Sequence, residues 1–206
     1  MRNATDSGST FYGASPDVVL ELLRKTGAYV TGHFRLSSGL HSPVYVEKFR
    51  LLERPELASK ALSLLAERFR NDGVSVVVGP TTGGIIVAYE VARHLGARAI
   101  FAEREGARRV LRRGFSISPR ERTLVVEDVV TTGLSVREVL DLVREEGGEV
   151  AGIGVIVDRS GGQVDFGVRT ERLLQVRIET YDPKECPMCK ENIPLVDPGS
   201  RRLVPS

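Results

Sequence analysis

The chain of 206 residues has little net charge, no long apolar run and only two cysteines. Its 29 basic residues are nearly balanced by 27 acidic ones, and the net charge of +2 argues against a general nucleic-acid-binding surface. No apolar run approaches the roughly 20 residues that span a membrane, and residues 1–10 lack the apolar core of a signal peptide. Two cysteines without an export signal favour the cytoplasm, and we expect neither a nucleic-acid nor a membrane partner.

The chain contains enough apolar sequence for one well-packed domain. Apolar residues make up 41% of it, and we find no internal repeat or low-complexity segment. Five short strand-like runs alternate with helical patterns from residue 55 onward, which predicts an α/β fold. We expect a single domain over 1–206, with an open, mainly parallel five-stranded sheet and helices on both faces. A flap at about 15–50 precedes the core at about 55–180, and a tail follows at about 181–206.

The stretch TLVVEDVVTTGLS has the most specific pattern in the chain. It predicts a buried strand over Thr123–Val126, two adjacent acids at Glu127 and Asp128, and a turn over Val129–Ser135 that enters a helix. Backbone N–H groups in such a turn point at a phosphate. The acids must face something positive: donating sugar hydroxyls, Mg²⁺ or a cationic transition state. Alternatively, the two carboxylates are simply solvated.

A second strand–loop–helix junction lies earlier in the chain. A strand over Val74–Val78 leads into the loop Gly79–Gly84, and a helix follows over Ile85–Leu95. Glycines let the backbone approach a ligand closely, and the start of the helix can hold an anion. The loop lacks the lysine of a P-loop, which excludes that type of triphosphate site. The alternative is that its glycines serve only tight packing.

Residues 103–115, EREGARRVLRRGF, carry five arginines, with glycines at positions 106 and 114. The pattern predicts a basic hairpin or a mobile loop. A solvated charge run is the usual explanation, but like charges this dense repel unless an anion visits. We therefore predict a lid that closes over pyrophosphate and neutralises it.

Arg159 follows a strand predicted over Val150–Val157. An arginine at the carboxyl end of a parallel strand lies on the ligand face of the sheet. The alternative is that Arg159 merely pairs with Asp158. Leu173–Ile178 is predicted to be a final strand at the edge of the sheet.

Cys186 and Cys189 have the spacing of half a zinc site. A structural zinc needs about four ligands, and the sequence shows no second pair nearby, although a dimer could supply one. We therefore predict reduced, non-catalytic thiols in the tail. His33 and His41 could be ligands, but lone loop histidines are more often surface residues, and that is our expectation here.

Four segments, in this order, resemble the orotate phosphoribosyltransferases of the type I phosphoribosyltransferase family. They are SGLHSPVY (38–45), GPTTGG (79–84) with the basic stretch after it, VVEDVVTTGLS (125–135) and Asp158-Arg159. The resemblance implies the type I fold, in which the flap is an N-terminal hood. It also implies that orotate and 5-phosphoribosyl 1-diphosphate (PRPP) give orotidine 5′-phosphate and pyrophosphate, with Mg²⁺ as cofactor. A homodimer sharing the basic loop across its interface is implied as well.

The resemblance assigns roles to individual residues. Glu127 and Asp128 hold the ribose hydroxyls and, with Arg104 of the basic loop, are catalytic. The implied PRPP site comprises Glu127, Asp128, Val129, Val130, Thr131, Thr132, Gly133, Leu134, Ser135, Thr82, Gly83, Arg104 and Arg109. Orotate would contact Thr131, Arg159 and Tyr45. Mg²⁺ would be held mainly by PRPP and water, with no direct protein ligand.

Two other functions remain open from the sequence. One is a phosphoribosyltransferase for a purine or another base, because the PRPP turn would look the same. The other is a non-catalytic, PRPP-sensing regulator that binds RNA. The near-neutral net charge weighs against the regulator, since binding a phosphate backbone demands a clearly basic surface.

Overall fold

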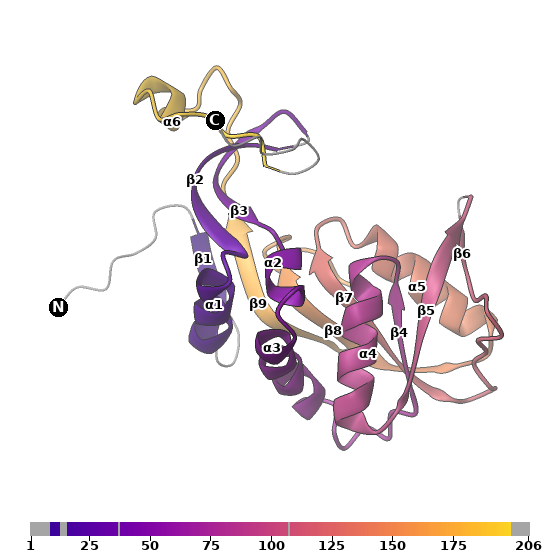
Figure 1. The fold of residues 1–206 in the computed structure, drawn as a ribbon. Coiled ribbons are helices and arrows are strands. Elements are labelled where there is room, and N and C mark those ends of the chain that lie inside the picture. Colours follow the sequence, from indigo (N-terminus) through magenta and orange to yellow (C-terminus); the bar gives the residue numbers. More distant parts are fainter. Residues whose placement is uncertain (1–8, 13–15, 37, 107, 199–206) are drawn as a thin grey trace.

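A sheet of seven strands runs through the computed structural model, which describes residues 9–12, 16–36, 38–106 and 108–198 (Figure 1). Its strands are β1 (Ser9–Tyr12), β4 (Val76–Pro80), β5 (Arg98–Glu105), β6 (Arg108–Val110), β7 (Arg122–Val130), β8 (Glu149–Asp158) and β9 (Thr170–Ile178). Across the sheet the order is β1-β9-β8-β7-β4-β5-β6. The strands from β9 to β5 are parallel, and β1 and β6 pair antiparallel at the two edges. The predicted α/β class is confirmed, and its five strands are the parallel ones.

Both edges of the sheet differ from the expectation. β1 pairs with β9 in the register Ser9 to Ile178, so the prediction that β9 lies at an edge is wrong. A polar segment near the N-terminus contributes this strand through backbone hydrogen bonds, which its hydropathy does not reveal. β6 comes from the basic stretch and pairs with the end of β5, as the predicted hairpin requires.

Helices cover both faces of the sheet. The helices of the described residues are α1 (Pro16–Lys25), α2 (Phe49–Leu52), α3 (Pro55–Glu67), α4 (Gly83–Leu95), α5 (Leu134–Glu145) and, in the tail away from the sheet, α6 (Pro187–Lys190). α1, α3 and α4 pack on one face and α5 on the other, so the sheet separates two apolar cores. None of these described helices has the length and apolar character needed to span a bilayer.

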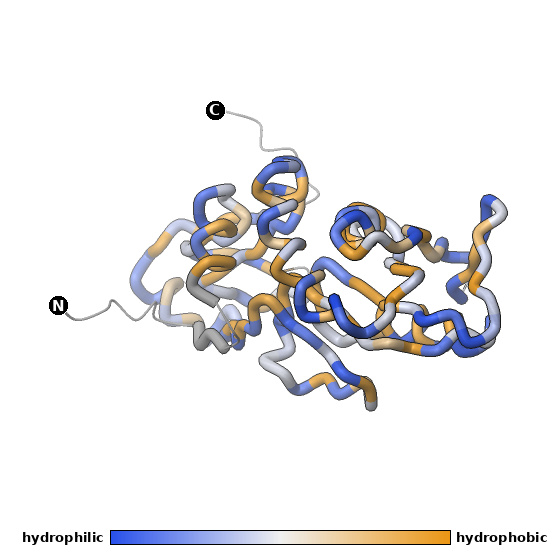
Figure 2. Tube along the Cα trace, turned by 90° about the horizontal axis from the view of Figure 1, so that it is seen from below, coloured by the Kyte–Doolittle hydropathy of each residue, from blue (hydrophilic) through white to orange (hydrophobic). Residues whose placement is uncertain are grey.

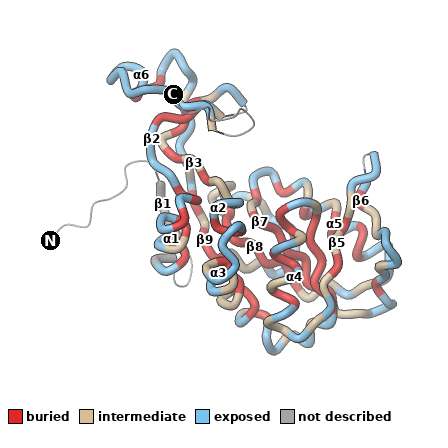
Figure 3. Tube along the Cα trace, in the orientation of Figure 1, coloured by how far each residue is buried: buried red, intermediate tan, exposed pale blue. Residues whose placement is uncertain are grey.

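The central strands supply both cores by alternation. Val77 and Leu124 face the α1, α3 and α4 side, whereas Val76, Val78 and Val125 face α5. All are fully buried, which explains why the central strands read as nearly continuous apolar runs. Figure 2 shows the apolar segments running through the inside of the trace, and Figure 3 shows the buried positions concentrated in the same strands.

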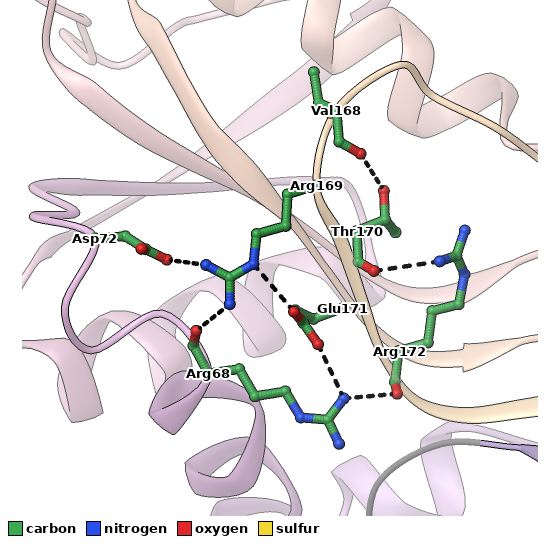
Figure 4. Close-up of polar contacts among 7 residues, drawn as sticks. All are labelled: Arg68, Asp72, Val168, Arg169, Thr170, Glu171 and Arg172. Atoms are coloured by element: carbon green, nitrogen blue, oxygen red, sulfur yellow. Dashed lines mark hydrogen bonds and ion pairs between the residues drawn. The ribbon is translucent and has the colours of Figure 1, made fainter.

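A polar network fastens the start of β9 to the turn after α3 (Figure 4). Arg169 donates to Asp72 Oδ2 at 2.7 Å and to the carbonyl of Arg68 at 2.6 Å. Arg68 in turn donates to the carbonyl of Arg172 at 2.9 Å, and Glu171 lies between the Arg68 and Arg169 guanidinium groups. The network lies at the opposite end of β9 from the hood and needs no ligand for its charges to be paired.

The predicted flap is an antiparallel hairpin of β2 (Tyr29–Arg35) and β3 (His41–Val46), which we call the hood. It extends away from the main sheet, and the tail with α6 lies beside it (Figure 1). Backbone bridges join Phe34 to Val196 and His41 to Tyr181.

Two expectations about the ligand-type residues of the hood and tail are wrong. His33 and His41 are 2% and 4% exposed, so they are not surface residues. Cys186 and Cys189 lie beside them, so the chain does contain a second pair of ligand-type residues.

Candidate active site

The site lies between β4 and β7, where the order in which the chain adds strands to the sheet changes direction. β4 and β7 are adjacent and parallel, but the chain continues from β4 to β5 on one side and from β7 to β8 on the other. The carboxyl ends of β4 and β7 therefore open into a crevice, which is where ligands bind in open α/β sheets. The loop after β4 and the turn after β7 are the two junctions that the sequence singled out.

Glu127 and Asp128 lie within β7 rather than after it. The strand extends to Val130, beyond the predicted end at Val126, because Val129 and Val130 still pair with β8. The Asp128 N–H donates to Glu127 Oε1 at 3.0 Å, and the Val129 N–H donates to Asp128 Oδ1 at 2.6 Å. Both acids are buried, at 7% and 3% exposed, which excludes the alternative of solvated carboxylates in this structure.

Burial changes the protonation of the acid pair. Burial, as the larger cause, and the neighbouring charge of Asp128 together raise the pKa of Glu127 from 4.5 to about 8. Glu127 is therefore largely protonated at neutral pH when no ligand is present. A ligand that brings positive charge favours its ionised form.

Lys48 is a site residue that the sequence analysis missed. It follows β3 and places Nζ 3.2 Å from Asp128 Oδ2. The ammonium is out of line for a hydrogen bond, and no other donor in the described part of the chain reaches that buried oxygen. The only available signal was a lysine just after a predicted strand, and such lysines are common.

The loop after β4 packs directly against the acid pair. A Cβ on Gly83 would lie 1.7 Å from Asp128 Oδ2, so any side chain there would displace the carboxylate. Inside the loop, a Cβ on Gly79 would lie 2.2 Å from the Gly84 carbonyl oxygen. The glycines therefore permit a close approach to Asp128 as well as tight packing, and Thr82 lies exposed next to them.

The turn after β7 has the features of an anion site. Gly133 adopts φ 78° and precedes α5, whose N-terminus carries positive partial charge. A pocket here is lined by Glu127 and residues 129–136. Within the described residues, nothing accepts a hydrogen bond from the backbone N–H groups of Thr131, Thr132 or Gly133. These three donors are available to a ligand.

Arg159 is not paired with its neighbour Asp158. Asp158 is fully buried and accepts from Arg172 Nε at 2.6 Å on one oxygen and from Ser160 on the other. Arg159 Nε is buried without a hydrogen-bond partner among the described residues. Burial lowers the pKa of Arg159, which makes an anionic ligand favourable there.

Tyr45 of the hood lies near Arg159 at the end of β8. Burial, followed by the charge of Glu47, raises the pKa of Tyr45, and the nearby Arg159 acts in the opposite direction. Tyr45 therefore lies within electrostatic range of Arg159, although the two are 114 residues apart in the sequence. The hood thus brings an aromatic side chain into the electrostatic environment of Arg159 at the end of β8.

The basic stretch forms the β5–β6 hairpin, and several of its arginines have acidic partners. Arg104 binds Glu138 of α5 at 2.6 Å, and the buried Arg109 donates to Glu138 at 3.1 Å and to Thr81 at 3.1 Å. Arg112 and Arg113 pair with acids of β5. The argument that these charges require a visiting anion is therefore wrong, although Arg109 does reach the loop after β4.

Comparisons with known proteins place this site in a family. The family model described as the phosphoribosyl transferase domain matches residues 50–166. The match begins just after Lys48 and includes the loop after β4, the acid pair, the turn after β7 and Arg159. The chain belongs to the phosphoribosyltransferase family.

Relatives that are similar in sequence show to which group within the family the chain is related. The chain is 57% identical to an orotate phosphoribosyltransferase of Pelotomaculum thermopropionicum, covering 91% of this chain and 98% of the relative. It is 52% identical to that of Thermotoga maritima, covering 90% and 100%. A solved orotate phosphoribosyltransferase from Aeropyrum pernix superimposes with a TM-score of 0.64 at 33% identity, covering 75% and 92%. Within its family the chain thus groups with the orotate phosphoribosyltransferases, as the resemblance implied.

Proposed function

We propose that this chain transfers the phosphoribosyl group of PRPP to orotate, giving orotidine 5′-phosphate and pyrophosphate, a step of pyrimidine nucleotide synthesis. A ring nitrogen of orotate gives up its proton, to the departing pyrophosphate or to water, and bonds to the anomeric carbon, while the bond to the pyrophosphate oxygen breaks and pyrophosphate leaves with its electron pair. The observation that carries the proposal is the juxtaposition, in one crevice, of a buried acid pair with turn N–H groups and an arginine Nε that have no hydrogen-bond partner among the described residues.

The acid pair acts on the ribose. Leaving of pyrophosphate develops positive, oxocarbenium-like charge on the sugar, and preorganised carboxylates stabilise such charge most where water is excluded. Asp128 Oδ2 has no hydrogen-bond donor among the described residues, so it can accept a hydrogen bond from a ribose hydroxyl. Glu127 is largely protonated, so it can donate a hydrogen bond to a ribose hydroxyl. Lys48 holds Asp128 in place until substrate arrives.

The turn after β7 binds the 5′-phosphate. The N–H groups of Thr131, Thr132 and Gly133 converge at the start of α5, and the hydroxyls of Thr131, Thr132 and Ser135 lie in the same turn. Leu134, Val129 and Val130 complete the lining. The acids lie in β7 and the turn follows it directly, so the strand fixes the distance between them. One ribose phosphate can therefore be bound through its hydroxyls by the acids and through its 5′-phosphate by the turn.

Arg159 selects the base. Its guanidinium can bind the planar orotate carboxylate through two parallel hydrogen bonds, which suits arginine better than any other residue. Asp158 does not compete for it, because Arg172 and Ser160 occupy both carboxylate oxygens. Tyr45 supplies an aromatic wall from the hood, and Thr131 lies at the border between base and phosphate.

The pyrophosphate side is formed by the loop after β4 and the basic hairpin. Thr82 and Gly83 border it, and Arg104 and Arg109 supply positive charge once Glu138 yields them to the substrate. Mg²⁺ fits this site, since buried carboxylates can bind its water ligands, and when bound it neutralises charge on the pyrophosphate. We propose that PRPP and water hold the ion. In a homodimer, the hairpin would reach toward the partner's site.

The direct test mixes the purified chain with Mg²⁺, PRPP and orotate and follows the loss of orotate's ultraviolet absorbance. A parallel panel of adenine, hypoxanthine and uracil is scored by pyrophosphate release. We expect turnover with orotate alone. Release with a purine and none with orotate would replace this proposal with the purine alternative. The two cysteines form no disulfide, which agrees with a cytoplasmic enzyme, and light scattering of the purified chain tests the dimer.

A further inference from the structure

Four ligand-type side chains meet where the tail crosses the hood. His33, His41, Cys186 and Cys189 each place one nitrogen or sulfur atom within 4.8 Å of all the others. They include both cysteines of the chain and two of its three histidines. The two pairs are about 150 residues apart in the sequence, so local chain geometry does not explain their meeting.

The surrounding backbone holds the two segments in register. His41 and Tyr181 exchange two backbone hydrogen bonds of 2.9 Å, and the Val196 N–H donates to the His33 carbonyl at 2.8 Å. The tail is thus tied to the hood on both sides of the cysteines. Cys186 precedes α6 and Cys189 lies in it, so the turn of that short helix brings both sulfur atoms to one side.

Three of the six separations between ligand atoms match a tetrahedral metal centre, and all six are within 4.8 Å. With Zn–S near 2.3 Å and Zn–N near 2.05 Å, neighbouring ligand atoms should lie roughly 3.3–3.8 Å apart. His33 Nε2 lies 3.5 Å from Cys186 Sγ and 3.7 Å from Cys189 Sγ, and His41 Nδ1 lies 3.3 Å from Cys189 Sγ. The two histidine nitrogens are closer, at 2.9 Å, and need to move apart by only a few tenths of an ångström.

Hydrogen bonds alone do not account for the arrangement. His33 Nε2 has three neighbours within 3.7 Å, but a ring nitrogen has one proton or one lone pair to offer. His33 Nδ1 lies 2.8 Å from the Ile193 carbonyl, which can only accept, so Nδ1 carries the proton. Nε2 therefore directs a lone pair at the centre of the cluster, with the backbone contact typical of metal-bound histidines.

We propose that His33 Nε2, His41 Nδ1, Cys186 Sγ and Cys189 Sγ bind one structural Zn²⁺. Two thiolates and two imidazoles select zinc over Mg²⁺ or Ca²⁺, which prefer oxygen. Four protein ligands complete the coordination shell and leave no position for a substrate, so the ion is structural rather than catalytic. His33, His41 and Cys186 are buried, and only Cys189 is exposed.

The ion would stabilise a region with little apolar core of its own. A two-stranded hairpin is marginal in water, and small modules often depend on a metal. His41 and Tyr45 are four residues apart on β3, so the strand that the ion anchors also carries the aromatic wall of the base site.

The first test measures metal in the purified full chain by inductively coupled plasma mass spectrometry. We expect about one zinc per chain, retained after passage through metal-free buffer. The double variant Cys186→Ser, Cys189→Ser should lose it. His94→Asn is the matched control, because His94 is the remaining histidine and contacts Ser59 and Glu90 of the core instead. Zinc retained by the double variant would overturn the proposal.

A second measurement avoids any variant that fails to fold. The wild-type chain is stripped with a chelator under reducing conditions and titrated with Co²⁺. A tetrahedral two-thiolate site should give saturable thiolate-to-cobalt charge-transfer and d–d absorption bands at about one equivalent. Cys189→Ser, at the exposed ligand, should weaken the charge-transfer band. Absence of these bands, or a Cys186–Cys189 disulfide in the protein as isolated, would contradict the proposal.

Amide hydrogen exchange with and without zinc tests whether the ion stabilises the contact between the hood and the tail. Removing zinc should raise the exchange rate of the His41 and Tyr181 amides, whose bonds tie the tail to the hood. Amides of β7 should be unaffected because the sheet has its own cores. Unchanged exchange in the hood of the stripped protein would remove the structural role. None of these readouts depends on transferase activity, so they remain decisive whatever base the enzyme uses.

Discussion

The crevice between β4 and β7 and the hood with its tail are stabilised in different ways. The crevice is built on parallel strands whose side chains fill two apolar cores, and its charged groups are held by the rigid sheet. The hood contributes few buried apolar residues, among them Phe34, Val44 and Val46, and its contacts with the tail are backbone bridges and polar groups. The acid pair and the phosphate-type turn thus lie on the rigid part, and Tyr45, which we propose as the wall of the base site, lies on the part that needs additional stabilisation.

Among the substitutions in the crevice, Asp128→Asn should have the largest effect on activity. The change keeps the shape but removes the charge that we propose faces the ribose, so kcat should fall about 100- to 1000-fold, as for other preorganised electrostatic groups. Steady-state kinetics with thermal unfolding measures both effects, and the melting temperature should change little. Asp141→Asn, on the exposed face of α5, is the control and should keep normal kinetics. Equal kinetics in wild type and Asp128→Asn would remove the assigned role.

Arg159→Ala tests whether base selection can be separated from PRPP binding. The KM for orotate should rise about 10- to 100-fold, the usual loss for hydrogen bonds to a charged group, while the KM for PRPP stays unchanged. Initial rates with each substrate varied in turn measure this. Arg144→Ala, an exposed arginine of α5, is the control. If both KM values rise equally, Arg159 is structural.

Glu127→Gln should alter the pH dependence of stability. The folded chain holds the Glu127 proton up to about pH 8, whereas the unfolded chain releases it near 4.5. The stabilisation that this proton provides is complete below pH 4.5 and is lost as pH rises to about 8. The melting temperature of the glutamine variant should therefore gain on the order of 10 °C on wild type across that window, at about 1.4 kcal/mol per pKa unit and 2–4 °C per kcal/mol.

A matched control for that prediction is Glu145→Gln. Glu145 is exposed at the end of α5, so its removal should leave the pH profile of the melting temperature unchanged. A difference between Glu127→Gln and wild type that is flat with pH would show that Glu127 does not retain its proton.

The smallest effect is expected at the surface of the hood. Arg35 Nε donates to Asp197 Oδ1 at 2.6 Å, and a second bond joins the same two side chains. Both are about half exposed, so the pair should contribute only about 0–1 kcal/mol. A double-mutant cycle with Arg35→Gln and Asp197→Asn measures the coupling free energy. A coupling well above 1 kcal/mol would mean that surface charge, rather than buried ligands, holds the tail.

Much of the sheet and the crevice was predictable because the signals are local. The central strands are short apolar runs bounded by glycine and charge, and the turn after β7 follows directly from its residues. The edge strand β1 was missed because backbone pairing in a polar segment leaves no periodic pattern. The end of β7 was placed four residues early because acids were taken to end the strand, whereas pairing with β8 continues past them.

The sequence by itself determined the alternation of strands and helices in the core from residue 55 onward, the acid pair and the phosphate-type turn, because each depends on residues within about ten positions. Only the tertiary structure decided that Lys48 meets Asp128, that Arg172 leaves Arg159 without a partner, and that two histidines of the hood meet two cysteines of the tail. Those contacts join segments that are distant in the chain. Their geometry is set by how the sheet and the hood pack, and no local pattern records it.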